Sequence, residues 1–203
     1  MTTEQKDYFA HKAKDYEKEV ARTGNVNNIA DTILKEICYS REDHLMDFGS
    51  GTGLLLENIA PHVKKITAVD MSEAMNTVLR SKAENIACEL EICHLDLSKD
   101  ALARKFDGII SSMTIHHVKD IKALFEKFHD MLEIGGTIAL ADLDSEDGTF
   151  HKEDTGVFHF GFERDMFLDA AKEARFKNLK IQDASIVQKP YGEYSVFLLT
   201  GEK

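Results

Sequence analysis

The chain has 203 residues, which is enough for one full-sized domain and too few for two comfortable ones. Its formal net charge of −11 argues against a nucleic-acid partner, because phosphate binding needs clustered Lys and Arg, and no basic stripe is visible. The sequence has no apolar run of about 18 residues, the length that spans a bilayer, and its polar start is unlike a secretory signal. We therefore expect a cytoplasmic protein that has no membrane partner and acts on a small-molecule substrate.

Two helical patterns come first. One runs from Glu4 to Val20 and is highly charged. The other runs from Val26 to Tyr39 and places four apolar residues on one face, namely Ile29, Ile33, Leu34 and Ile37. Between them, Arg22-Thr23-Gly24-Asn25 is typical of a turn. We expect a single domain over residues 1–203, in which residues 1–40 form a helical lid over a core of residues 41–203.

From residue 44 onward, short β-branched runs alternate with helical patterns, which predicts a parallel sheet built from βαβ units. Strands are expected at His44–Phe48, Ile66–Asp70, Leu90–His94, Phe106–Ser112, Thr137–Ala141, Leu179–Val187 and Tyr194–Thr200. Between them we expect a helix that carries Leu54, Leu55 and Ile59, one capped by Ser72, and others over Val118–Leu132 and Arg164–Ala174. Arg175 follows the last helix, where a left-handed arginine would be strained.

The three cysteines, Cys38, Cys88 and Cys93, form no CxxC pair and are odd in number. A disulfide framework needs more cysteines at other spacings, so we predict reduced and mostly buried thiols.

Glycines follow the first predicted strand at positions 49, 51 and 53, directly before a helix. In open α/β sheets, ligands bind outside the carboxyl ends of the strands. The first three strands also end in acids, namely Asp47, Asp70 and Asp96. We therefore expect these three carboxylates to converge beside the glycine loop at one edge of the sheet.

The same residues discriminate between cofactors. A dinucleotide site requires GxGxxG/A and no negative charge near its pyrophosphate, whereas here Leu54 replaces the third glycine and Asp47 stands at the entrance. No Gly-Lys-Ser/Thr follows the turn, which excludes a P-loop. A ligand that carries an ammonium and a sulfonium but no phosphate is attracted to such acids. S-adenosylmethionine has this chemistry.

Five segments carry a resemblance to a known family. They are Met46–Gly53, Val69–Ser72, His94–Leu97, Phe106–Ser112 and Gly135–Thr137. In this order and spacing, over about residues 44 to 142, the chain resembles class I S-adenosylmethionine-dependent methyltransferases. It looks closest to the small-molecule branch that includes ubiquinone and menaquinone biosynthesis methyltransferases. The segment Phe9–Glu17 resembles the N-terminal helix of that branch, where an aromatic residue closes over the cofactor.

The resemblance implies a fold that periodicity alone does not give. It is an α/β, Rossmann-like, mostly parallel sheet of seven strands in the order 3-2-1-4-5-7-6. The seventh strand is antiparallel, helices cover both faces, and an N-terminal helical lid completes the fold.

For the methionine part of the cofactor, the resemblance implies wrapping by the loop residues Gly49, Ser50, Gly51, Thr52 and Gly53. Asp47 would reach the ammonium group, Ser112 would line the sulfonium side, and Tyr16 would cover the carboxylate.

For the adenosine part, the resemblance implies that Asp70 bonds both ribose hydroxyls, because a carboxylate offers two acceptors. Met71 would pack on the adenine face. Asp96 would accept from the adenine amino group, with the Leu97 amide beside it.

The pair His116-His117 follows the fourth predicted strand, at the mouth of the expected site. Methyl transfer is an in-line displacement that needs a base only if the nucleophile must lose a proton. Histidine suits that task near neutral pH, so His116 and His117 are the candidate catalytic residues. The alternative is that one packs under the loop while the other faces solvent or cofactor.

The segment between the fifth strand and the next helix is rich in acids and histidines, namely Asp142, Asp144, Glu146, Asp147, His151, Glu153, Asp154 and His159. Such groups can bind a divalent metal, but no ligand spacing of known specificity is present. We therefore favour a solvated acidic loop that helps to cover the substrate, and we predict no metal site. Four phenylalanines nearby are expected to form either an apolar substrate wall or core packing, namely Phe150, Phe158, Phe160 and Phe162.

We therefore predict an enzyme that transfers a methyl group from S-adenosylmethionine to a small molecule and yields S-adenosylhomocysteine. A protein that binds S-adenosylmethionine as a sensor, without catalysis, is the alternative. A nicotinamide-dependent oxidoreductase is disfavoured by Asp47 and Leu54.

Overall fold

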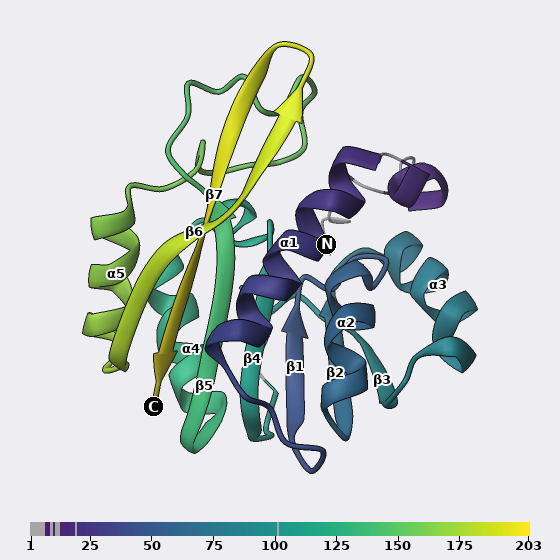
Figure 1. Ribbon diagram of the computed structural model, residues 1–203, viewed down its shortest axis with the longest axis vertical. Coiled ribbons are helices and arrows are strands. Elements are labelled where there is room, and N and C mark those ends of the chain that lie inside the picture. The colour runs from purple at the N-terminus through teal and green to yellow at the C-terminus, as the bar shows by residue number, and fades with distance from the viewer. Residues whose placement is uncertain (1–6, 9, 11–12, 19, 101) are drawn as a thin grey trace, which may run out of the picture.

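The computed structural model describes residues 7–8, 10, 13–18, 20–100 and 102–203, and seven strands form one sheet. The strand order is β3-β2-β1-β4-β5-β7-β6, as predicted (Figure 1). The strands are β1 His44–Phe48, β2 Lys65–Asp70, β3 Glu89–His94, β4 Phe106–Ser112, β5 Leu132–Leu143, β6 Lys177–Lys189 and β7 Gly192–Glu202. β1 to β5 pair in parallel, and β7 pairs antiparallel with both β5 and β6. The carboxyl ends of β1, β2 and β3 therefore meet at one edge.

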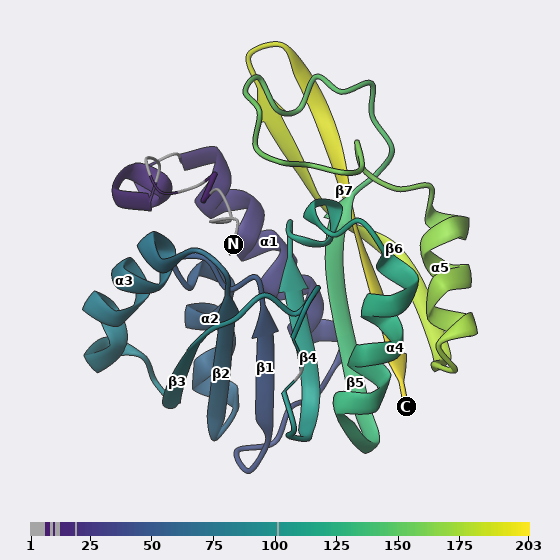
Figure 2. The same ribbon diagram turned by 180° about the vertical axis from the view of Figure 1, so that it is seen from behind.

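Helices cover both faces of the sheet (Figures 1 and 2). The α-helices are α1 Val20–Glu36, α2 Leu54–Ile59, α3 Glu73–Lys82, α4 Ile121–Met131 and α5 Arg164–Glu173. Short 3-10 helices are η1 Ala13–Lys18, η2 Ala60–His62, η3 Ala83–Asn85 and η4 Ile115–His117. Among the described helices, none is long and apolar enough to cross a membrane.

Two apolar cores lie on opposite faces of the sheet because neighbouring strand residues point to opposite sides. Leu45 belongs to the core formed with α1 and α2, whereas Met46 belongs to the core formed with α4 and α5. β1 and β4 are buried along most of their length, as expected for strands covered by helices on both faces. These central strands form a rigid base for the loops at their carboxyl ends.

The N-terminal region differs from the sequence prediction. α1 runs without a break through Arg22-Thr23-Gly24-Asn25, where we predicted a turn. A Cβ atom at Gly24 would meet nothing within 4 Å, so this glycine makes no tight turn. Ile29 and Ile33 are fully buried, and their packing stabilises the helix across the glycine. The predicted helix Glu4–Val20 lies partly outside the described residues, and its described part contains the 3-10 helix η1.

The hairpin of β6 and β7 extends beyond the carboxyl edge of the sheet, next to the loop of residues 144–163 (Figure 1). Both strands are longer than we predicted, and their outer parts pair only with each other. The two ends of the loop are joined by main-chain hydrogen bonds from the Ser145 N–H to the Phe162 carbonyl (3.0 Å) and from the Glu146 N–H to the Phe160 carbonyl (2.9 Å). The β6–β7 hairpin and the 144–163 loop together form a wall beside the edge of the sheet at which ligands bind in this fold.

Three smaller predictions have clear outcomes. Ser72 caps α3, since its side chain accepts a hydrogen bond from the Met75 N–H at 3.2 Å. Arg175 is left-handed, with a φ of 72°. The prediction of mostly buried thiols was wrong, because Cys38 is exposed while Cys88 and Cys93 are half-buried; all three are free.

Candidate functional site

The glycine loop connects β1 to α2 at the carboxyl edge of the sheet. Gly49, Gly51 and Gly53 have φ values of 68°, 53° and 92°, in the left-handed region that favours glycine. A Cβ atom at Gly53 would lie 2.6 Å from Leu79 of α3, so this glycine allows the loop and α3 to pack closely. A Cβ atom at Gly51 would instead project into open space. Gly51 therefore leaves room for a ligand rather than for a neighbouring helix.

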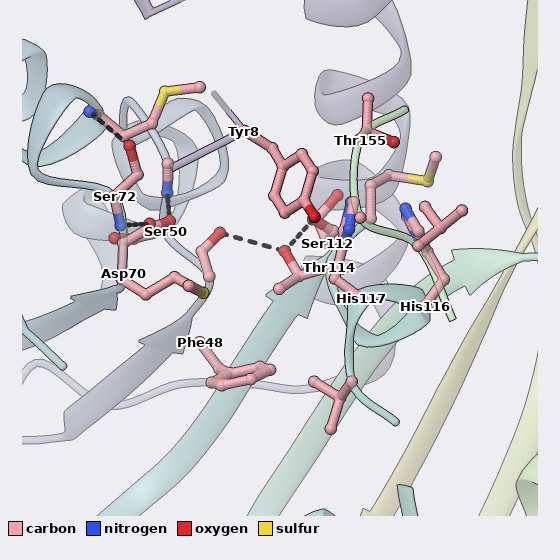
Figure 3. A pocket seen from close by; sticks show the side chains of 18 of the residues that line it. Tyr8, Phe48, Ser50, Asp70, Ser72, Ser112, Thr114, His116, His117 and Thr155 are labelled. Carbon is pink, nitrogen blue, oxygen red and sulfur yellow. Dashed lines mark hydrogen bonds between the residues drawn. The ribbon is translucent and has the colours of Figure 1, made fainter. Parts of the chain in front are cut away.

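Asp70, the last residue of β2, ties the loop to the start of α3. Its Oδ2 accepts a hydrogen bond from the Gly51 N–H at 2.8 Å, and its Oδ1 accepts one from the Ser72 N–H at 2.7 Å (Figure 3). Burial raises the pKa of this carboxyl, and these N–H groups act in the opposite direction. Each oxygen keeps a second acceptor site, since a carboxylate can accept about four hydrogen bonds.

Asp47 lies at the base of the loop, in the middle of the sheet. Its side chain is buried, and its Oδ2 has no hydrogen-bond partner among the described residues. Burial, and then the charge of Asp70, raise the pKa of this carboxyl to about 8. A buried acceptor without a partner is costly unless a ligand supplies a donor. A cationic group of a ligand would satisfy Asp47 and favour its ionised form.

Asp96 follows β3 and is engaged with its own loop. Its Oδ1 accepts hydrogen bonds from the Ser98 N–H at 3.0 Å and from the Ser98 hydroxyl at 2.6 Å. Its Oδ2 lies 3.0 Å from the ammonium of Lys99. An adenine amino group that binds Asp96, as predicted, would therefore share this carboxylate with Ser98 and Lys99.

A cavity of about 1130 Å³ opens at this edge of the sheet. It is lined by thirteen of the fourteen residues predicted for the site, namely Tyr16, Asp47, Gly49, Ser50, Gly51, Thr52, Asp70, Met71, Asp96, Leu97, Ser112, His116 and His117. The exception is Gly53, which does not line the cavity but allows Leu79 to pack closely against the loop. The hydroxyls of Ser50, Thr52 and Ser112 are buried and have no partner among the described residues. The cavity wall therefore offers several polar groups to a ligand.

The N-terminal region also contributes residues that the sequence analysis missed. Arg22 and Asn25, placed in a turn by prediction, lie on the first turns of α1 and line the cavity. The Arg22 guanidinium stacks on the ring of Tyr16, 3.9 Å from its centroid. Tyr8 lies over the cavity, where a Cβ atom at Gly156 would come within 2.7 Å of its ring (Figure 3). The N-terminal segment and the 144–163 loop thus meet above the cavity. Phe9, also in the predicted lid segment, lies outside the described residues.

His116 and His117 line the same cavity from η4, directly after β4 (Figure 3). His116 is buried, and its Nδ1 lies 2.6 Å from Oδ1 of Asp142 at the end of β5. Burial raises the pKa of Asp142, but His116 and nearby main-chain N–H groups outweigh it and lower the pKa overall. Burial, and then His116, lower the pKa of His117 to about 3. His117 is therefore neutral and a weak proton acceptor at physiological pH.

The four phenylalanines of the 144–163 loop divide into three groups. Phe150 and Phe158 line the cavity, which agrees with an apolar wall. Phe162 is buried in the core beside Phe167, with ring centroids 4.9 Å apart. Phe160 is 56% exposed and outside the cavity. The β6–β7 hairpin also lines the cavity through Val187, Lys189 and Tyr191, none of which was among the predicted site residues.

Comparison with known proteins identifies the protein family of the chain. A family model described as a methyltransferase domain matches residues 9–183. The chain belongs to this family. A methyltransferase of Schizosaccharomyces pombe, itself uncharacterized, is 30% identical over 162 residues, which cover 71% of this chain and 55% of the relative. A ubiquinone biosynthesis O-methyltransferase of Coxiella burnetii is 34% identical over 102 residues, which cover 47% of this chain and 41% of the relative. The chain thus spans about half the length of these curated relatives.

Solved methyltransferase structures share the fold at low sequence identity. The N-methyltransferase NodS of Bradyrhizobium japonicum matches with a TM-score of 0.68 and 15% identity, over 91% of this chain and 97% of that one. Phosphoethanolamine N-methyltransferase 2 of Haemonchus contortus, in complex with phosphomonomethylethanolamine and S-adenosylhomocysteine, matches with a TM-score of 0.71 and 15% identity. That match covers 97% of this chain and 59% of the other. The resemblance to class I methyltransferases and the predicted fold are both confirmed.

Proposed function

We propose that this methyltransferase-family protein transfers a methyl group from S-adenosylmethionine to a small-molecule acceptor and releases S-adenosylhomocysteine. One observation carries the proposal, namely the buried Asp47 carboxyl at the cavity wall, whose Oδ2 has no partner among the described residues. S-adenosylmethionine supplies an ammonium for this acid and brings no phosphate that the neighbouring acids would repel. When bound, the cofactor supplies an electrophilic methyl group on a sulfonium.

The methionine part of the cofactor matches the inner end of the cavity. Asp47 would bind the ammonium group, and the unpartnered Ser112 hydroxyl would face the sulfonium side. The methionine carboxylate needs a cation or donors, and Arg22 stacked on Tyr16 lies at the cavity wall. We assign the carboxylate to Arg22 together with Tyr16, because guanidinium groups bind carboxylates through paired hydrogen bonds.

The adenosine part matches the outer end, beside β2 and β3. Each oxygen of Asp70 already accepts one main-chain N–H and retains one acceptor site for a ribose hydroxyl. Met71 is 42% exposed at the cavity edge, where its thioether can pack on an adenine ring. Asp96 and Leu97 complete this end. The open space at Gly51 allows the ligand to approach the main chain.

The acceptor would bind on the side of β4 and β5, where the apolar wall and the histidines meet. Methyl transfer requires the attacking atom to lie in line with the methyl group in a site from which water is excluded. Phe150, Phe158 and the hairpin residue Val187 supply apolar surface there. His116, held by Asp142, is better suited than His117 to activate an acceptor, because the carboxylate fixes its ring orientation.

A turnover assay separates the enzyme from the alternative, a sensor that binds the cofactor without catalysis. The protein would be incubated with S-adenosylmethionine and a panel of small hydroxyl, thiol and amine acceptors, and S-adenosylhomocysteine would be measured by mass spectrometry. We expect acceptor-dependent product that is absent without acceptor and strongly reduced in Asp47→Ala. Tight cofactor binding without turnover on any acceptor class would favour the sensor.

A further inference from the structure

The structure brings a third histidine to the pair that the sequence analysis singled out. The ligand nitrogens of His116, His117 and His151 all lie within 4.8 Å of one another, although His151 is some 35 residues away in the chain. All three residues line the cavity, and Figure 3 shows His116 and His117 side by side near Ser112. From these contacts we propose that His116, His117 and His151 bind a divalent transition-metal ion, with an open coordination position that faces the cavity.

The contacts of His116 prepare its Nε2 as a metal ligand. Oδ1 of Asp142 lies 2.6 Å from Nδ1 of His116, so the carboxylate accepts the Nδ1 proton. In the neutral ring, the lone pair is then on Nε2, which points at His151. A carboxylate behind a ligating histidine is the usual way in which metal sites fix the tautomer and orientation of the ring.

Asp142 is itself held in place. Its oxygens accept hydrogen bonds from the His116 N–H at 3.1 Å and from the Leu143 N–H at 2.8 Å, and the residue is fully buried. His117 has a comparable support, because its ring donates a hydrogen bond to the main chain at Gly156. Two of the three imidazoles thus donate a ring N–H to a hydrogen-bond acceptor, as metal-ligating histidines do through the nitrogen that does not bind the metal.

One of the nitrogen–nitrogen distances matches a tetrahedral site. Nε2 of His116 and Nε2 of His151 are 3.3 Å apart. Zinc–nitrogen bonds of about 2.0–2.1 Å in tetrahedral geometry place neighbouring ligand nitrogens about 3.3–3.4 Å apart. A direct hydrogen bond between the two rings has a similar length, and a metal titration distinguishes the hydrogen bond from a metal site. Imidazole ligands favour zinc and related first-row ions over magnesium or calcium.

The loop that carries His151 is fixed on both sides. The Phe150 carbonyl, directly before it, accepts a hydrogen bond from the Lys189 ammonium at 2.7 Å. The main-chain N–H of Phe158 donates to the His116 carbonyl at 3.0 Å. The 144–163 loop is therefore held against η4 beside the three histidines. A site with three protein ligands and one open position is typical of catalytic rather than structural zinc.

The role of the ion rests on the proposed function. In this role the ion replaces His116 as the group that activates the acceptor, because Nε2 of a metal-bound His116 cannot accept a proton. An acceptor hydroxyl or thiol that binds at the open position loses its proton to solvent, and its oxygen or sulfur becomes the nucleophile. That atom forms a bond to the methyl carbon while the bond from the methyl carbon to the sulfonium sulfur breaks. The products are the methylated acceptor and neutral S-adenosylhomocysteine. The site therefore favours hydroxyl or thiol acceptors.

Metal binding can be tested without cofactor or acceptor, so its failure and the failure of the proposed function are distinguishable. Zn²⁺ would be titrated calorimetrically into the metal-free, untagged full chain. We expect one equivalent per chain, with affinity lowered at least about 10-fold in His151→Ala and about 10- to 100-fold in Asp142→Asn. The matched control is His62→Ala, since His62 is exposed on η2, and it should bind as the wild type does.

Co²⁺ gives a second readout that does not depend on affinity alone. The wild-type complex should show the strong visible absorption of tetrahedral cobalt, and His151→Ala should not. His151 is on a loop, so this variant is expected to keep the thermal melting temperature of the wild type within a few degrees. The proposal is overturned if the wild type shows no stoichiometric site, or if folded His151→Ala binds Zn²⁺ as tightly as the wild type. Either result would leave a plain hydrogen bond between His116 and His151.

Discussion

Asp70 accepts a hydrogen bond from the Gly51 N–H at 2.8 Å, so the acid assigned to the ribose also holds the glycine loop in shape. Through its other oxygen the same carboxylate holds the start of α3 at Ser72. Loop geometry and cofactor affinity therefore depend on one side chain. This coupling determines how variants of the loop are expected to behave.

Replacement of Asp70 should reduce cofactor affinity strongly. Asp70→Ala removes the acceptors for both ribose hydroxyls and frees the Gly51 N–H, which we expect to cost about 1.5–3 kcal/mol of binding free energy. Calorimetry with S-adenosylmethionine measures the loss. Asp169→Ala, an exposed acid on α5, is the control and should bind unchanged. Equal affinity in Asp70→Ala and wild type would remove Asp70 from the site.

Two glycines of the loop should respond differently to alanine. Gly51→Ala places a methyl group in the open cavity, and Gly53→Ala places one 2.6 Å from Leu79. In both variants, the left-handed backbone conformation of the alanine costs about 1–2 kcal/mol. We expect Gly53→Ala to lose more thermal stability, because of the Leu79 clash, and Gly51→Ala to lose more cofactor affinity. Melting curves and calorimetry on both proteins test this order, and the reverse order would contradict it.

The buried Asp47 should make stability depend on pH. Its pKa is raised in the folded chain from 3.8 to about 8, so the unfolded chain ionises it first. The free energy of unfolding without cofactor should therefore fall as pH rises from about 4 to about 8. Asp47→Asn cannot ionise, so its stability should exceed that of the wild type most above pH 8 and least near pH 4. Denaturant unfolding across this range measures the difference, and a gap that is constant with pH would refute the assignment.

Arg175 terminates α5 in a conformation that suits glycine better. Its φ is 72°, and its N–H donates to the Lys172 carbonyl at 2.8 Å. Arg175→Gly removes the strain and should raise the free energy of unfolding by about 0.5–1 kcal/mol. Arg175→Ala, which keeps a Cβ atom, is the control and should give no such gain. A stabilised alanine variant would assign the effect to the lost guanidinium instead.

Much of the sheet was predictable because its strands are short, buried and bounded by clear signals. β1 and β4 have the predicted limits, Asp70 ends β2 as expected, and Asp47 is the penultimate residue of β1. The order of the strands came from the family resemblance, since periodicity does not encode which strands pair. The three acids reach one cavity because parallel strands end at the same edge.

The missed features depend on contacts between distant segments. The turn predicted at Arg22–Asn25 is helical because Ile29 and Ile33 pack α1 on the sheet, which outweighs the local preference of Gly24. The strand ends that the prediction missed at the hairpin turn, residues 188–189 and 192–193, contain no buried residue, so the strand pattern is weak there. The nearness of His151 to His116 arises only when the 144–163 loop folds back over η4.

The proposed function requires this cavity to bind S-adenosylmethionine through Asp47. The most direct measurement is a calorimetric titration of S-adenosylmethionine into wild type and into Asp47→Ala, with NADH as the competing dinucleotide. We expect saturable one-to-one binding in the micromolar to submillimolar range, competition by S-adenosylhomocysteine, weaker binding in the variant and no binding of NADH. Saturable binding of NADH, or S-adenosylmethionine binding that Asp47→Ala leaves unchanged, would contradict it.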